Sequence, residues 1–201
     1  MPELVALHIA DPPALWRELG FTLAGRDCDI GGVQHRLGAD GVGVTRWEVA
    51  GLSAFKELAT ADATTSAKTK GVAHPNGVCA LDHVVVTTPD LSRTVAAFEE
   101  ASITLRRTRE ASATMTQAFF KLGAVVIEVV GNPTVADSGP ATFWGLTFTV
   151  DDLDATAVLL GERLRPIKDA VQSGRRIATL DRAAGSSLPI AFMSAADRTP
   201  D

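Results

Sequence analysis

The sequence lacks several features that define particular protein classes. It has no tyrosine and only two cysteines, Cys28 and Cys79, among 201 residues. Two cysteines without CxxC spacing form neither a disulfide framework nor a redox or metal motif, so we expect two reduced, partly buried thiols. The absence of tyrosine and the small number of lysines indicate a high-GC genome and carry no mechanistic weight.

Long apolar runs and an excess of basic charge are also missing. No stretch approaches the roughly 20 apolar residues of a membrane helix. The N-terminal residues lack the basic and apolar segments of a signal peptide. The formal net charge is −5, whereas a nucleic-acid-binding protein needs a basic face. We therefore expect a cytoplasmic protein with neither nucleic-acid nor membrane partners.

The sequence contains a repeated pattern of one strand, one helix and three strands. The clearest copy, called here the second unit, spans residues 80–131 and opens with a β-branched strand at 81–87. Asp90 or Ser92 can cap the helix that follows. The third unit, residues 142–194, repeats this order, with Asp152 at the position of Asp90.

A shorter copy, the first unit, occupies residues 1–52. Residues 60–70 contain almost no large apolar side chain, which is typical of a flexible linker, so we assign 53–79 to a linker and 195–201 to a tail. The second and third units are joined by a much shorter loop, and short connections favour spatial neighbours. We therefore expect these two units to form one domain over residues 80–194.

Several segments resemble the vicinal oxygen chelate superfamily, which includes glyoxalase I, extradiol dioxygenases, methylmalonyl-CoA epimerase and bleomycin-resistance proteins. They are LDHVVV at 81–86 with PDL at 89–91, AFFKLG at 118–123 with IEV at 127–129, and FTVDDLD at 148–154. The resemblance implies an α+β fold of paired βαβββ modules, glyoxalase-like half-barrels around a cavity, here with a degenerate extra N-terminal module. The fold hosts many chemistries and some pure binders.

The resemblance also implies one divalent metal ion (Zn, Fe, Mn, Ni or Co), because the family's first and last strands supply inward His and Glu ligands. The positions carried over are His83 and Glu128. Gly145 and Ala191 hold the matching positions of the third unit and cannot ligate. Two ligands rarely hold a metal. Glu48, which matches Glu128 in the first unit, would complete the set if the first unit paired with the second, within the chain or across a homodimer.

His83 and Glu128 each have a structural alternative. His83 is either a ligand or a half-buried residue that is only hydrogen-bonded. Glu128 is a ligand, a general base, or the ion-pair partner of Arg176 or Lys121, because an unpaired carboxylate among β-branched residues is costly.

Four further residues are candidates for substrate binding. Strand alternation places Gln117 and Phe119 on one face, and Arg176 is expected to match Gln117 and to favour an anionic or carbonyl-bearing ligand. Trp144 opens the third unit and either lines the cavity or packs in the core.

Other conspicuous side chains have ordinary explanations. The arginines at 106, 107 and 109 are expected on a solvated sheet edge. His8, His35 and His74 are expected at a loop edge, on a strand surface and in a turn.

Two functions remain open at this point. One is a metal-dependent lyase, isomerase or oxygenase that acts on a carbonyl or diol compound, with Glu128 as a catalytic residue. The other is a metal-free protein of the resistance type, which binds and sequesters a small-molecule ligand. The retained His83 and Glu128 favour the first, whereas Gly145 and Ala191 favour the second.

Overall fold

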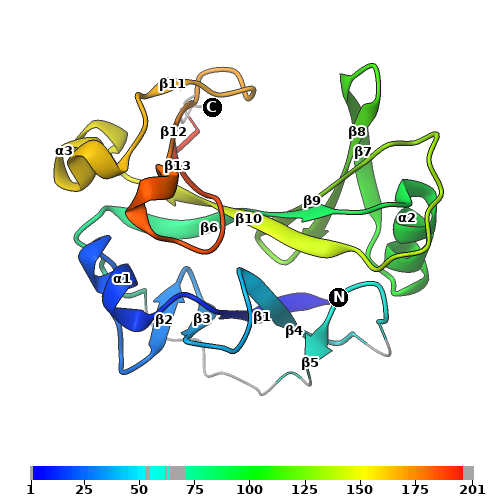
Figure 1. Cartoon of the computed structure of the whole chain (residues 1–201), viewed down its shortest axis with the longest axis horizontal. Coiled ribbons are helices and arrows are strands. Elements are labelled where there is room, and N and C mark those ends of the chain that lie inside the picture. Colours follow the sequence, from blue (N-terminus) through cyan, green and yellow to red (C-terminus); the bar gives the residue numbers. More distant parts are fainter. Residues whose placement is uncertain (1, 53–54, 62, 64–70, 197–201) are drawn as a thin grey trace, which may run out of the picture.

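The computed structural model describes residues 2–52, 55–61, 63 and 71–196. The strands form two sheets, in the orders β2-β3-β1-β4-β5 and β11-β12-β13-β10-β6-β9-β8-β7 (Figure 1). The elements are β1 (Glu3–Ile9), α1 (Pro13–Glu18), β2 (Asp27–Ile30), β3 (Val33–Leu37), β4 (Val44–Ala50), β5 (Thr60–Ala61), β6 (Val78–Thr87), α2 (Leu91–Glu100), β7 (Leu105–Ser112), β8 (Met115–Leu122), β9 (Val125–Gly131), β10 (Thr142–Val150), α3 (Leu153–Leu160), β11 (Lys168–Asp169), β12 (Arg176–Thr179) and β13 (Ile190–Ser194), with short 3-10 turns at Gly161–Arg163 and Arg182–Ala184.

The larger sheet consists of the second and third units joined at their first strands. In the second unit β6 pairs in parallel with β9, and in the third β10 pairs in parallel with β13. The strand orders β6-β9-β8-β7 and β10-β13-β12-β11 are therefore the same. An antiparallel pairing of β6 with β10 makes the two halves one sheet. This arrangement confirms the prediction of paired βαβββ modules.

In both units an aspartate side chain caps the N-terminus of the helix. The side chain of Asp90 accepts a hydrogen bond from the backbone N–H of Arg93 at the start of α2. Asp152 accepts from the N–H groups of Asp154 and Ala155 at the start of α3. Each aspartate satisfies donors that the first helical turn leaves unpaired.

The smaller sheet contains the first unit. Its strands pair in the same pattern as the central strands of the larger sheet. β1 pairs in parallel with β3 and antiparallel with β4, and β4 pairs in parallel with β5. The same relations hold for β10 with β13, β10 with β6, and β6 with β9. Thus β4 takes the place of a first strand, and Glu48, which lies on it, does not occupy the strand position equivalent to Glu128.

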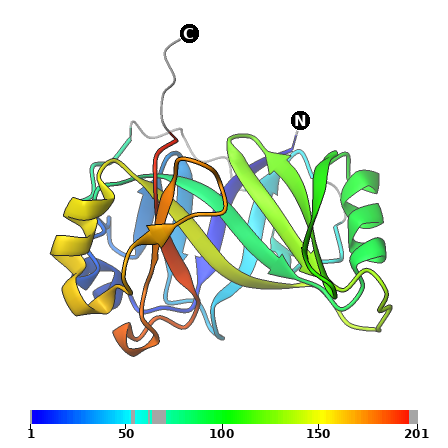
Figure 2. The same cartoon turned by 90° about the horizontal axis from the view of Figure 1, so that it is seen from above.

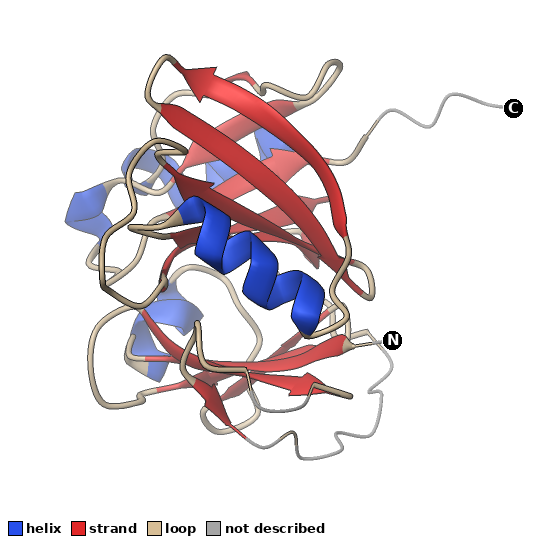
Figure 3. Cartoon of the chain, turned by 90° about the vertical axis from the view of Figure 1, so that its right-hand side faces the viewer, coloured by secondary structure: helices blue, strands red, loops and turns tan. Residues whose placement is uncertain are grey.

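The two sheets pack face to face around one hydrophobic core (Figures 1 and 3). Near α3, the ring of Trp16 lies 6.0 Å from that of Phe148 on β10. Near α2, the ring of Trp47 lies 6.1 Å from that of Phe98 and 5.6 Å from that of Phe143. The first unit thus covers one face of the larger sheet, called here the core face. The opposite face carries His83 and Glu128 and is called the pocket face.

Part of the expected linker is ordered structure. Phe55 and Leu58 are buried in the core, and Thr60–Ala61 form β5 on the edge of the smaller sheet. Asn76 is fully buried and donates a hydrogen bond from Nδ2 to the carbonyl of Leu19. The rest of the low-complexity run, residues 64–70, lies outside the described residues, as do 197–201 of the expected tail.

His35 differs from its expected place on a strand surface. It is fully buried, and its ring lies 5.6 Å from that of Phe148. Burial lowers its pKa to about 4, so the imidazole is neutral near pH 7. Its strand alternates in the opposite phase from the expectation, because Val33, His35 and Leu37 all face the core.

Candidate functional site

Two β-bulges shape the pocket face (Figure 2 shows the sheet from above). On β6, His83 pairs with Thr147 and Leu81 with Phe148, which leaves Asp82 as an extra residue. On β10, Trp144 is the extra residue in the same way. Both stand the same number of residues before the N-cap aspartate of their unit. Because a bulge re-aims the side chains beside it, the sheet presents Asp82 next to His83.

Asp82 fixes the orientation of His83. Its Oδ1 lies 2.9 Å from His83 Nδ1, and its Oδ2 lies 2.8 Å from a guanidinium nitrogen of Arg175 and accepts from Thr149 Oγ1 at 3.0 Å. Burial acts to raise the pKa of Asp82, but the hydrogen bonds from His83 and Arg175 outweigh it and lower the pKa to about 2. An ionised carboxylate only accepts hydrogen bonds, so the neutral form of His83 carries its proton on Nδ1 and turns an unprotonated Nε2 toward Glu128.

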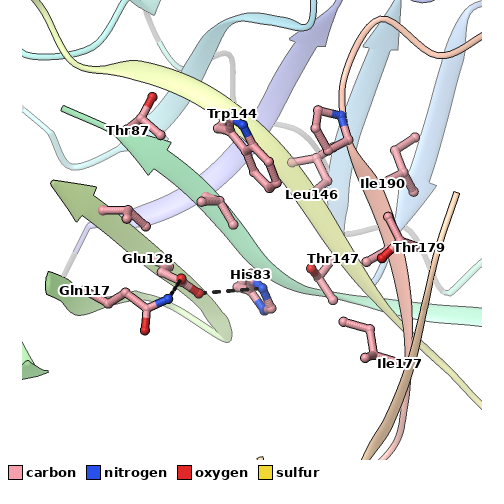
Figure 4. Close-up of a pocket in the computed structure, with 14 residues that line it drawn as sticks. His83, Thr87, Gln117, Glu128, Trp144, Leu146, Thr147, Ile177, Thr179 and Ile190 are labelled. Atoms are coloured by element: carbon pink, nitrogen blue, oxygen red, sulfur yellow. Dashed lines mark hydrogen bonds and ion pairs between the residues drawn. The ribbon is translucent and has the colours of Figure 1, made fainter. Parts of the chain in front are cut away.

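Glu128 is held by a chain of side chains from β7 and β8, of which Figure 4 draws Gln117. Its Oε2 lies 3.8 Å from His83 Nε2, and its Oε1 accepts a hydrogen bond from Gln117 Nε2. Arg109 in turn donates from Nε to Gln117 Oε1 at 2.8 Å. The amide of Gln117 is thereby oriented with its donor end toward the carboxylate. Arg109 lies on the edge strand β7, as expected, and in addition it positions Gln117.

A cavity of about 380 Å³ opens between these groups and the third unit (Figure 4). This size is typical of small-molecule sites. Trp144 is about half exposed at 53% and lies along it. The lining combines one polar side with a mainly apolar wall, and consists of His83, Val85, Thr87, Gln117, Glu128, Val130, Trp144, Leu146, Thr147, Ile177, Thr179, Pro189, Ile190 and Ala191.

The structure separates the four expected substrate-binding residues. Gln117 and Trp144 line this cavity, whereas Phe119 lines an adjoining one. Arg176 lines neither, because its guanidinium bonds Asp154 of α3 at 2.6 Å.

The prediction that Arg176 matches Gln117 was wrong by one residue along the strand. Gln117 pairs with Val130, and Ile177 pairs with Met193, which is the residue equivalent to Val130 in the third unit. Ile177 is therefore the counterpart of Gln117, and a shift of one residue turns a side chain to the other face of a strand.

The third unit lacks the polar pair that the second unit has. Part of the space for such side chains is occupied by its own backbone. Val85 pairs with Glu128, and its counterpart Thr147 pairs with Ala191, so Ala191 stands where Glu128 stands in the second unit. At Gly145, a Cβ atom would lie 2.8 Å from the carbonyl oxygen of Pro189. A histidine at this position therefore does not fit without a backbone shift.

Glu48 of the first unit does not supply a third metal ligand within the chain. Glu48 accepts hydrogen bonds from His8 at 2.8 Å and Arg36 at 2.5 Å. Its neighbour Trp47 points into the core between the sheets, so Glu48 faces away from the pocket face. The version of this site across a homodimer stays a prediction.

Within one chain, the described side chains do not fit a resident metal ion. His83 and Glu128 offer two ligands, and in the described ranges no three His, Cys, Asp or Glu side chains come together in a way that could hold a metal. Protein metal sites usually provide three or four ligands.

Residues 80–175 match the model of the Glyoxalase/Bleomycin resistance protein/Dioxygenase superfamily. Together with the paired modules, this match shows that the chain carries a domain of that superfamily. No curated protein matches the sequence. None of the described helices is long and apolar enough to cross a membrane.

Three solved structures match about three fifths of this chain at low sequence identity. Methylmalonyl-CoA epimerase from Mycobacterium tuberculosis is 17% identical, with a TM-score of 0.49 over 61% of this chain and 91% of that one. A hypothetical protein from Bacillus halodurans is 12% identical, with a TM-score of 0.48 over 60% and 97%. A Streptomyces coelicolor methylmalonyl-CoA epimerase variant in complex with 2-nitronate-propionyl-CoA is 17% identical, with a TM-score of 0.48 over 60% and 96%.

Proposed function

We propose that the cavity beside His83 and Glu128 binds a small organic molecule without a protein-held metal. The observation that carries this proposal is the asymmetry of the two units. The second unit contributes a polar pair, whereas the third contributes Ala191 and a glycine whose side-chain space is taken by Pro189. The cavity still has a volume of about 380 Å³ and contains the polar pair of the second unit, although the ligand set is incomplete.

The lining defines the kind of molecule that fits. The hydroxyls of Thr147 and Thr179 can donate hydrogen bonds to a ligand oxygen, and His83 Nε2 can accept one. The apolar wall suits a hydrocarbon or aromatic body, against which the indole of Trp144 can stack. A carbonyl or hydroxyl compound with an apolar portion satisfies both sides.

One observation favours a second function, proton transfer. The hydrogen bond from His83 Nδ1 to Asp82 leaves Nε2 as the basic atom facing the cavity. In such a reaction, a C–H bond next to a carbonyl breaks, Nε2 takes the proton, and the electron pair moves into the carbonyl to form an enolate. Return of the proton to the same face restores the substrate, whereas protonation of the opposite face by solvent gives the epimer and releases the first proton to water. A base held this way contributes rate through position and protonation state.

Metal analysis together with ligand binding tests the first function. We expect purified protein to contain no stoichiometric divalent metal and added Zn²⁺, Mn²⁺ or Co²⁺ to leave its melting temperature unchanged. In a thermal-shift screen of small carbonyl and aryl compounds, hits should lose their effect in His83→Ala and Trp144→Ala. They should keep it in Arg176→Ala, whose side chain points away from the cavity. One bound metal per chain that disappears in His83→Ala and Glu128→Ala would overturn the proposal.

Deuterium exchange tests the second function. A screening hit with a hydrogen next to its carbonyl should exchange that hydrogen with D₂O only when the protein is present, as measured by NMR. Asp82→Asn should slow the exchange by at least about tenfold, because the amide no longer enforces the Nδ1–H tautomer. Arg176→Ala should leave the rate unchanged. Exchange that does not respond to Asp82→Asn would rule out His83 as the base.

A further inference from the structure

A second cavity of about 400 Å³ continues from the first along the pocket face. The two cavities share His83 and Glu128. Along β6, Val85 and Thr87 line the first cavity, and the residues before His83 line the second. His83 and Glu128 therefore stand where the two cavities meet, and the two cavities together are called here the groove. The second cavity is lined by Ala80, Leu81, Asp82, His83, Arg107, Phe119, Ala124, Val126, Glu128, Thr149, Gln172 and Arg175.

The two arginines of the second cavity differ in whether their guanidinium groups already have hydrogen-bond or ion-pair partners. Arg175 is bound to Asp82 at 2.8 Å, donates to the carbonyl of Ser194 at 2.7 Å and has only 12% of its side chain exposed. Arg107 has no hydrogen-bond or ion-pair partner among the described side chains, and its guanidinium carbon lies 4.5 Å from the centre of the Phe119 ring. Arg107 is therefore the cation of this cavity that remains available to a ligand.

The Phe119 ring lies against the guanidinium of Arg107 and orients it for binding an anion. Phe119 is buried, with 7% of its surface exposed, so it offers a fixed support for the guanidinium. A cation over an aromatic face is attracted to it, and the N–H groups at the guanidinium edge stay free to donate. A carboxylate or phosphate accepts two such bonds at once.

The remaining charges set the direction in which an anionic ligand lies. Glu128 stands in the middle of the groove and repels an anion there. The charge of Asp82 is compensated by Arg175. The other end of the groove is mainly apolar and is bounded by Trp144, Ile177 and Ile190.

We propose that the natural ligand is an elongated anionic molecule. Its carboxylate or phosphate binds Arg107, its apolar body lies beside Trp144, and its central portion crosses His83 and Glu128. This inference rests on the proposed small-molecule function and specifies the class of ligand.

A pair of dyes that differ only in charge tests the inference. Anilinonaphthalene sulfonate and the uncharged N-phenylnaphthylamine share the same aromatic body, and both fluoresce on entering an apolar site. We expect the sulfonate to bind more tightly than the amine. Arg107→Gln should weaken the sulfonate about tenfold, which corresponds to about 1.4 kcal/mol, and should leave the amine unchanged. Trp144→Ala should weaken both dyes.

Two further variants separate a specific anion contact from general charge. Arg106→Gln removes an equal charge from the neighbouring position, outside the groove, and should change neither dye. Arg107→Lys should restore only part of the sulfonate affinity, since an ammonium cannot bind two oxygens in a fork. Equal loss of sulfonate affinity in Arg106→Gln and Arg107→Gln would overturn the inference. So would an unchanged ratio of the two affinities in Arg107→Gln. Failure of both dyes to bind the wild-type protein would instead contradict the proposed function itself.

Displacement of the amine dye identifies the type of anion. Phenylbutanoate, phenylpropyl phosphate and the neutral phenylbutanamide serve as competitors. We expect at least one of the two anions to compete about tenfold better than the amide, and Arg107→Gln to remove that advantage. Competition by the amide at the strength of both anions would overturn the inference.

Discussion

The second and third units have the same fold, but they place different kinds of side chain on the pocket face. Both have parallel first and last strands, a helix capped by aspartate and a bulge at the same place in the first strand. The second unit places Asp82, His83 and Glu128 beside its bulge. The third places Trp144 at its own bulge and has Gly145 and Ala191 beyond it. The residues that specify the fold thus lie mainly on the core face and at the helix cap.

The core face differs between the units in a second respect. Phe98 of the second unit belongs to a cluster with Trp47, Phe55 and Phe143, none of which titrates. The third unit meets the first unit through a cluster around Phe148 that includes the imidazole of His35. The contact around Phe148 should therefore depend on pH, unlike the contact around Phe98.

The largest expected effect comes from Phe148→Ala. The Phe148 ring is fully buried and lies 5.4 Å from that of Phe21 and 6.2 Å from that of Phe192, so its removal leaves a cavity between the two sheets. We expect the free energy of unfolding to fall by about 3–5 kcal/mol, as measured by urea denaturation. The equivalent change Val86→Ala should cost about 2 kcal/mol, because fewer carbon atoms are removed. Equal effects would mean that the two units do not differ here.

The next effect concerns acid and His35. The pKa of His35 is lowered from 6.5 to about 4 in the folded protein, chiefly by burial, with Asp29 and His74 as its charged or titratable neighbours. The neutral ring therefore stabilises the fold fully above pH 6.5, and this stability is lost as pH falls from 6.5 toward 4. The total is about 3 kcal/mol, since one pKa unit corresponds to about 1.4 kcal/mol.

Urea denaturation at several pH values checks this dependence. His74 also has a pKa lowered by burial and adds to the slope in the same direction. His35→Gln should give a flatter dependence between pH 6.5 and 4 than the wild type, even if its stability at pH 8 is lower. An unchanged slope would show that the third unit's cluster is no more sensitive to acid than the cluster around Phe98.

A third prediction concerns a variant that gives the third unit the carboxylate it lacks. Ala191→Glu places a carboxylate at the position equivalent to Glu128, facing the same cavity. Together with His83 this gives three ligands, and we expect divalent metal to bind at least about tenfold more tightly than to the wild type, measured by calorimetry. Ala191→Gln, which has the same size without the charge, should not show the gain. Equal gains in the two variants would mean that Ala191 is not the counterpart of Glu128.

The sequence revealed the paired modules because their signals are local. The β-branched strands, the aspartate caps and the glycine turns recur in the same order. The placement of Arg176 failed because pattern matching left an uncertainty of one residue, and one residue reverses the face of a strand. The roles of Arg109 and Asp82 were missed because they depend on a neighbouring strand and on a bulge, neither of which leaves a local pattern. Glu48 shows the same limit, since only strand pairing distinguishes a first strand from a last one.

The smallest effect compares the two helix caps. Asp90 receives one backbone hydrogen bond and lies 3.9 Å from the guanidinium of Arg93, whereas Asp152 receives two backbone bonds. Each change to alanine should lower the free energy of unfolding by about 1 kcal/mol, because donors of the first turn lose their partner. The change to asparagine should retain most of the stability in both units, since Asn is an equally good cap. Thermal denaturation of the four variants measures the effects. A loss of 2 kcal/mol or more at only one site would show that its aspartate has a tertiary role beyond capping, and that the shared helix start is less equivalent than its geometry.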